Sequence, residues 1–221
     1  MRAALANGAN FWNGGDFYGP AEYNSNVLLE AYFAKYPEDA DKVVLSIKGA
    51  LHGSAPDQLR ASVDQTLRQL NGRKRLDMFE CGRRDPSVPL SVTLGVLQTE
   101  YVDKGLLGGI SLSEVRAETI HEAVQTGVKI VAVEVELSLF STDVLHNGVA
   151  AACAQYGIPL IAYSPLGRGV RALNLLSRVS VLGLVLTVCG NAALDRPDQN
   201  PRRPPGRLAP APLPPLLPRQ L

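Results

Sequence analysis

The sequence contains few cysteines and no surplus of charge, and both shortages exclude classes of protein. Its three cysteines are odd in number, widely separated and without CxxC spacing. This pattern argues against a disulfide framework and a zinc site, and it favours a reducing compartment. The formal net charge is +1, from 22 basic and 21 acidic residues, so electrostatics give no reason to expect a nucleic-acid partner.

Signals for targeting, membrane insertion and metal binding are also scarce. The apolar stretch after Met1 is too short for a secretory signal peptide. The apolar run at 179–194 is shorter than the roughly 20 residues that a helix needs to cross a bilayer. The three histidines show no HExxH or other ligand spacing. We therefore expect a cytoplasmic protein with no membrane segment and no metal.

The sequence does contain a regular alternation of strand and helix signals. Short apolar runs predict six strands, at 10–12, 42–48, 75–81, 108–113, 129–136 and 160–163. Apolar residues at helical spacing predict five helices between them, at 25–36, 54–70, 91–104, 118–125 and 143–156. Strict alternation with continuous apolar strands predicts a parallel sheet covered by helices.

A barrel and a doubly wound sheet both satisfy this pattern. No GxGxxG turn follows a strand, and polar residues follow several different strands, which favours the barrel. Six units cannot close an eight-unit barrel, so the predicted α/β fold is an incomplete TIM (β/α)8 barrel over residues 1–170. A hydrophobic segment of uncertain structure follows at 171–194. Nine prolines among the last 26 residues predict a disordered tail at 195–221.

The loop after the first strand carries a functional signal. Two glycines end the apolar run, and Asp16, Phe17 and Tyr18 follow them. Catalytic groups of α/β barrels lie in such loops, at the carboxyl ends of the strands. The alternative is an ordinary βα turn in which the aromatic rings pack and the glycines turn the chain.

Six stretches, each at the end of a strand, resemble the aldo-keto reductases, most closely the fungal pyridoxal reductase-like branch. They are 10–19, 43–48, 76–86, 109–113, 132–141 and 158–169. The resemblance implies a (β/α)8 barrel that uses NADPH to reduce a small aldehyde, such as pyridoxal, to its alcohol. It also implies truncation at both ends. The family's first strand would precede Met1, and its eighth strand and 2′-phosphate motif would follow residue 170.

The resemblance assigns catalytic roles to three residues. Tyr18 matches the tyrosine that protonates the carbonyl oxygen, and Lys48 matches the lysine that assists it. A free phenol has a pKa of about 10, and a neighbouring ammonium lowers that pKa, which makes the phenol a usable acid. Asn13 stands where the family has an aspartate, so it can orient Lys48 by a hydrogen bond but cannot supply an ion pair.

Other matched positions imply a cofactor site. Tyr163 matches the aromatic residue that stacks on the nicotinamide, although core packing at a strand end is an alternative. Ser111 and Glu134 match the positions that hold the carboxamide, where the second residue is usually glutamine. The loop that wraps the pyrophosphate corresponds to Ser164, Leu166 and Gly167, and Arg168 could add charge there.

One further departure concerns the second polar contact to the carbonyl oxygen. Gly82 stands where most of the family has a histidine, and losing such a donor can slow a reaction by a factor of about 100 to 1000. Two alternatives to a reductase therefore stay open. One is a non-catalytic barrel that binds NADP(H) or a protein partner, and the other is an inactive fragment. Tyr18 and Lys48 favour the enzyme, whereas the sequence after residue 170 favours the fragment.

Overall fold

The computed structural model describes residues 1–167. The predictions for the end of the barrel domain at 168–170, for the segment 171–194 and for the tail 195–221 lie outside these residues, as does Arg168. Throughout the described part, strands and helices alternate as predicted.

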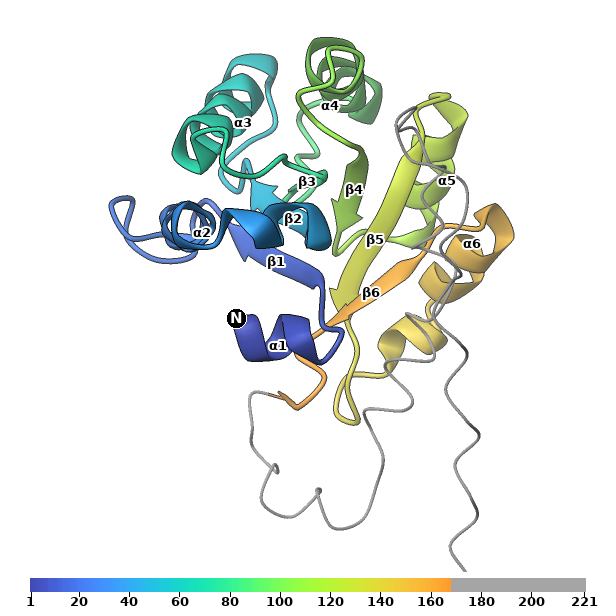
Figure 1. Ribbon diagram of the computed structural model, residues 1–221. Helices are drawn as coiled ribbons and strands as arrows, with labels where there is room; N and C mark the ends of the chain where they lie inside the picture. Colours follow the sequence, from blue (N-terminus) through green and yellow to red (C-terminus); the bar gives the residue numbers. More distant parts are fainter. Residues whose placement is uncertain (168–221) are drawn as a thin grey trace, which may run out of the picture.

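The core of the fold is one parallel sheet whose strands are in sequence order (Figure 1). The strands are β1 (Phe11–Gly15), β2 (Val44–Gly49), β3 (Met78–Cys81), β4 (Ile110–Ser113), β5 (Ile130–Glu136) and β6 (Leu160–Tyr163). The sheet is curled, as shown by a hydrogen bond between a side chain of β1 and a side chain of β5, four strands away. This arrangement is the predicted incomplete TIM barrel.

Helices cover the outer side of this curved sheet (Figure 1). Each connection between strands contains an α-helix, and α1 precedes β1. The α-helices are α1 (Arg2–Ala6), α2 (Ser25–Lys35), α3 (Pro56–Leu70), α4 (Leu90–Leu97), α5 (Ala117–Gln125) and α6 (Val149–Tyr156). Shorter helical turns are η1 (Pro37–Lys42), η2 (Gln98–Val102) and η3 (Asp143–Leu145).

The strands are not the continuous apolar runs that the sequence predicts, because their side chains alternate between an apolar face and a polar face of the sheet. In β2, Leu45 and Ile47 are fully buried in the hydrophobic core. Ser46 and Lys48 point to the opposite, concave face, because successive side chains of a strand alternate. Side chains on both faces of β2 are buried, so burial alone does not distinguish the apolar core face from the polar concave face. The polar concave face forms the site.

Several element boundaries differ from the prediction, and three of the differences have a clear local reason. β1 continues through both glycines, since a Cβ on Gly14 would lie 3.0 Å from Ile47 and Ser25; glycine there permits close packing rather than a turn. The helix predicted at 91–104 becomes a π-turn after residue 97, where the Thr99 hydroxyl bonds the backbone carbonyl four residues earlier. The helix predicted at 143–156 is interrupted by Gly148, whose φ of 88° is left-handed.

Close packing at the end of β2 leads to a stability prediction for Gly49→Ala. A Cβ on Gly49 would lie 2.4 Å from the Ser62 hydroxyl and 2.6 Å from the Phe79 ring. We expect Gly49→Ala to lower the free energy of unfolding by about 1–3 kcal/mol, measured by urea denaturation. Gly95→Ala is the matched control, because that helical position is open and alanine there should add up to about 1 kcal/mol. Equal effects of the two changes would contradict the packing argument.

Candidate active site

Lys48 is the centre of a charged cluster inside the curve of the sheet. Its side chain is only 5% exposed, and its ammonium group forms an ion pair with the Glu134 carboxylate on β5. The carboxyl group of Glu80 on β3 lies 3.4 Å from the same nitrogen. Glu80 and Lys48 are register partners on neighbouring strands, which places both on the concave face. Two acidic side chains therefore flank one buried ammonium.

Asn13 joins this cluster from β1 through Glu134. Its side-chain amide donates a hydrogen bond of 2.5 Å to Oε2 of Glu134, while Oε1 of Glu134 accepts from Lys48. The sequence led us to expect that Asn13 would orient Lys48 by a direct hydrogen bond and would not itself supply an ion pair. The ion pair is present instead, because a carboxylate from the opposite side of the barrel supplies it.

Glu80 is a residue of the site that the sequence analysis missed. The available signal was a lone acidic residue inside the apolar strand β3. Its significance depends on the strand register that sets Glu80 beside Lys48, and register is a property of the folded sheet.

Burial and proximity set the charges of this cluster. Removal from water, together with the charge of Glu134, raises the pKa of the Glu80 carboxyl to about 8. Glu80 therefore holds its proton to a higher pH than an exposed glutamate does. Burial alone would lower the pKa of Lys48, but the acidic groups of Glu80 and Glu134 outweigh burial and raise that pKa above its ordinary value. The cluster thus places two carboxyl groups around one buried ammonium.

The raised pKa of Glu80 predicts how stability depends on pH. An unfolded glutamate loses its proton near its ordinary pKa of 4.5, whereas folded Glu80 keeps its proton until about pH 8. Between these values the folded state binds more protons, so the free energy of unfolding falls as pH rises, by at most about 1.4 kcal/mol per pH unit from this group. We expect urea denaturation from about pH 6 to 8 to show a flatter slope for Glu80→Gln. Glu38→Gln, at an exposed position, is the control and should leave the slope unchanged. An unchanged slope in Glu80→Gln would show that Glu80 does not cause the pH dependence.

Tyr18 lies beside the cluster, and 44% of its surface is exposed. Its backbone N–H donates to the carbonyl of Gly15, so the chain turns back directly after β1. Glycine at 15 makes room for the ring, because a Cβ there would lie 3.0 Å from Cγ of Tyr18. Phe17 packs edge-on against the same ring at 4.8 Å between centroids. Gly15 is the register partner of Lys48 on β2, so the ring that packs on Gly15 lies next to the strand that carries Lys48.

The neighbouring acid, Asp16, has a different role. Its carboxylate accepts a hydrogen bond from the Ser62 hydroxyl on α3, and its backbone N–H donates to the carbonyl of Lys48 at 2.9 Å. Burial raises the pKa of Asp16 above its ordinary value. Asp16 therefore anchors the start of the Tyr18 loop to the sheet and to α3.

Tyr163 faces the cluster from the last described strand. The Lys48 ammonium lies 5.4 Å from the centre of its ring, which brings β6 opposite β2. Burial and a hydrogen bond to Glu114 raise the pKa of Tyr163 to about 12, so this phenol stays protonated. Its ring is suited to stacking rather than to proton transfer.

The other predicted cofactor residues lie on β4 and in the loop after β6. The Ser111 hydroxyl donates a 3.4 Å hydrogen bond to the carbonyl of Phe79. Ser164 and Gly167 close a turn through a 2.9 Å backbone hydrogen bond, and Leu166 in this turn is exposed. Gly167 has a φ of 54°, and a Cβ there would lie 2.8 Å from the Phe140 ring. These candidates thus lie on β4 and in the turn that follows β6.

Gly82 lies close to apolar side chains, so a larger residue there would require these neighbours to shift. A Cβ on Gly82 would lie 3.1 Å from Leu51 and 3.3 Å from the ring of Phe17. The Phe17 ring thus lies between Gly82 and the Tyr18 ring, with which it packs edge-on.

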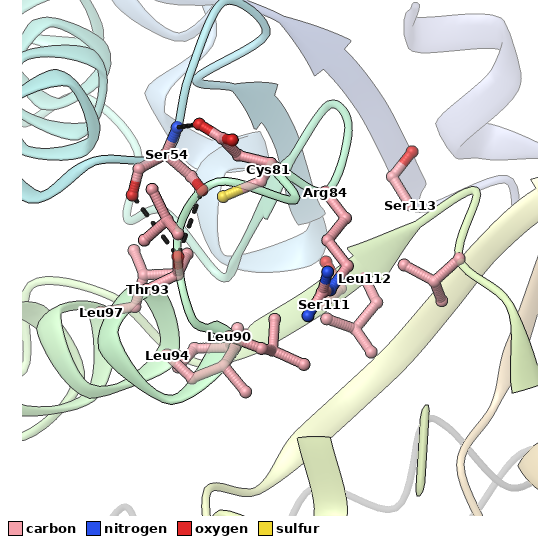
Figure 2. Close-up of a pocket in the computed structure, with 14 residues that line it drawn as sticks. Ser54, Cys81, Arg84, Leu90, Thr93, Leu94, Leu97, Ser111, Leu112 and Ser113 are labelled. Carbon is pink, nitrogen blue, oxygen red and sulfur yellow. Dashed lines mark hydrogen bonds between the residues drawn. The ribbon is translucent and has the colours of Figure 1, made fainter. Parts of the chain in front are cut away.

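A cavity lies outside the barrel interior, between α4 and the ends of β3 and β4 (Figure 2). Leu90, Leu94 and Leu97 of α4 line one side of it. Ser54 and Thr93 bond to each other across its edge, with 3.2 Å between their hydroxyl oxygens. Its volume of about 30 Å³ can hold water but not an aldehyde substrate.

Two other kinds of feature are absent from residues 1–167. No three His, Cys, Asp or Glu side chains in this part are grouped so that they could hold a metal ion. No helix in the same range is long and apolar enough to cross a membrane.

The fold and the cluster define a barrel protein of the α/β class with its polar site at the carboxyl ends of the strands. The chain belongs to the Aldo/keto reductase family, whose sequence profile matches residues 1–174. It is 44% identical over 178 residues to "Probable pyridoxal reductase 2" of Schizosaccharomyces pombe, covering 77% of this chain and 53% of that protein. It is 38% identical over 183 residues to "Putative pyridoxal reductase" of Saccharomyces cerevisiae, covering 77% and 52%. The chain thus spans about half the length of these curated relatives.

Solved structures agree on the fold. A thermostable aldo-keto reductase in complex with the inhibitor epalrestat superposes with a TM-score of 0.70 at 21% identity, over 84% of this chain and 69% of that one. An aldo-keto reductase from Klebsiella pneumoniae in complex with NADPH gives a TM-score of 0.67 at 18% identity, over 87% and 66%.

Proposed function

We propose that this protein reduces a small aldehyde of the pyridoxal type to its alcohol, with NADPH as the reductant. The observation that carries the proposal is the buried ammonium of Lys48 beside the half-exposed phenol of Tyr18. Family membership and the relatives named as pyridoxal reductases support the same reaction and substrate class.

In the proposed reaction Tyr18 is the acid. Its phenol gives a proton to the carbonyl oxygen of the aldehyde, and the phenolate that remains is stabilised by the charge of Lys48. The bound NADPH supplies the hydride that reaches the carbonyl carbon, so the carbonyl gains one hydride and one proton. The exposed side of Tyr18 lets the phenol recover a proton from water after each cycle.

The residues on β6 fit the nicotinamide end of the cofactor. Tyr163 holds an aromatic ring close to the Lys48 ammonium, as a stacked nicotinamide beside the reacting carbonyl requires. The turn from Ser164 to Gly167 has small residues at both ends and lies at the carboxyl end of the sheet, where a phosphate can approach the backbone closely. We propose that Tyr163, Ser111 and this turn hold the cofactor.

An assay on the purified 221-residue chain tests the function. Absorbance of NADPH is followed with pyridoxal and with an aromatic aldehyde, and NADPH binding is measured separately by fluorescence. Turnover of either aldehyde supports the proposal. Binding of NADPH without turnover of any aldehyde would contradict the reductase and favour the alternative of a non-catalytic barrel that binds NADP(H).

A cytoplasmic location is a further part of this proposal. The two cysteines in the described range, Cys81 and Cys153, are free thiols, which suits a reducing compartment. Burial raises the pKa of Cys81 to about 12 and that of Cys153 to about 11, so neither thiol ionises readily. Fractionation of cells that produce the chain would test the location.

A further inference from the structure

Both oxygens of the Glu134 side chain accept hydrogen bonds from side chains of the site, a task distinct from the cofactor contact that the resemblance assigns to it. A carboxylate oxygen can accept more than one hydrogen bond, but two partners on different strands already fix the orientation of this group. Oε1 of Glu134 is engaged by Lys48, and Oε2 is engaged by Asn13. Glu134 is also almost fully buried.

These contacts connect three strands that are not all neighbours in the sheet. Asn13 is on β1, Lys48 on β2 and Glu134 on β5. The amide of Asn13 orients the carboxylate, and the carboxylate in turn limits where the Lys48 ammonium can lie. The ammonium is also surrounded by Glu80, by the Tyr163 ring and, from the loop after β1, by Tyr18.

We propose that Glu134 is a positioning residue that, held by Asn13, directs Lys48 toward Tyr18. The proposal rests on the reductase function proposed above and assigns to Glu134 a task other than cofactor binding. A buried charge pair has this directional effect because charge-assisted hydrogen bonds are short and strongly oriented. Glu80 is the more distant partner, since its nearer oxygen is 3.4 Å from the ammonium.

The chain offers a charge exchange that tests this directly. Glu134→Gln removes the carboxylate, and Asn13→Asp in the same chain restores one at the other end of the same hydrogen bond. In this double variant the amide introduced at position 134 can donate its N–H to the new carboxylate and accept from Lys48 through its carbonyl. Both hydrogen bonds that join positions 13, 134 and 48 are therefore kept. Glu118→Gln, an exposed carboxylate at the start of α5, is the control for the chemical change alone.

Three quantities are measured for each variant: kcat with pyridoxal, the Kd for NADPH by fluorescence, and the midpoint of urea denaturation. We expect Glu134→Gln to lower kcat by about 10- to 100-fold, because displacing a catalytic group by about 1 Å has effects of this size. The Kd should stay within about threefold, and the double variant should recover most of kcat and of the midpoint.

Other results would overturn the assignment. A Kd raised tenfold or more with kcat nearly unchanged would mean that Glu134 binds the cofactor. A loss of kcat that the double variant does not recover would leave Glu134 a merely structural residue. If the unaltered chain turns over no aldehyde, the proposed reductase function fails, and with it the catalytic role of Glu134. Recovery of the denaturation midpoint by the double variant would then still identify Glu134 as the partner of Lys48.

Discussion

Tyr18→Phe is expected to lower kcat for aldehyde reduction by about 100- to 10,000-fold, the usual contribution of a positioned general acid. The substitution removes one hydroxyl from a ring that packs on Gly15 and Phe17, so the ring keeps its place. The side chain is exposed and its hydroxyl forms no hydrogen bond with another described residue, so stability should change little. The measurement is steady-state oxidation of NADPH at saturating aldehyde, together with the Kd for NADPH.

The same loop supplies the control for this variant. Tyr23 is 81% exposed, and Tyr23→Phe removes an equivalent hydroxyl a few residues away. We expect the control to retain full kcat and both variants to bind NADPH as the unaltered chain does. A Tyr18→Phe enzyme with more than about a tenth of the original kcat would show that another group donates the proton.

Lys48→Met is expected to cost about 3–5 kcal/mol of unfolding free energy, the usual result of leaving a buried charge without its partner. The substitution keeps the length and apolar stem of the side chain but removes the only ammonium that contacts Glu134 within the described residues. Because domains are stabilised by about 5–15 kcal/mol, such a loss is a large share of the total. Urea denaturation measures it.

A double variant separates the charge effect from the loss of packing. In Lys48→Met/Glu134→Gln no carboxylate is left at position 134, so the double variant should be more stable than Lys48→Met alone. Glu38→Gln, which disrupts the exposed 3.4 Å pair with Arg2, should cost less than about 1 kcal/mol. A double variant less stable than Lys48→Met would show that packing, and not the unpaired charge, dominates the loss.

Periodicity was sufficient to predict the arrangement of elements but not their exact limits. Strand and helix signals depend on local side-chain patterns, so the six strands and the helices between them were predicted correctly. The end of α4 and the interruption before α6 depend on single residues, Thr99 and Gly148, whose effect on the backbone competes with the helical pattern. Gly14 and Gly15 suggested a turn, and only the packing of neighbouring groups explains why they lie in a strand.

The candidate site was predicted less completely, because its contacts cross the barrel. Tyr18, Lys48 and Asn13 were selected from local motifs and a family resemblance, and they lie around one cluster. The partner of Lys48 could not be inferred from those motifs, since Glu134 is distant in sequence and reaches Lys48 only after the sheet has curled. Glu80 was missed for a related reason, because its importance depends on strand register.

The long sequence separation within the cluster also concerns how the molecule folds. Asn13 and Glu134 are 121 residues apart, and Lys48 and Glu134 are 86 apart. Contacts between such distant segments require the closure of long loops, and they form slowly compared with helices and neighbouring strands. During refolding, far-ultraviolet circular dichroism should therefore recover before the Lys48 cluster assembles. The chemistry of the site thus becomes available only at the end of folding, when the first and fifth strands meet.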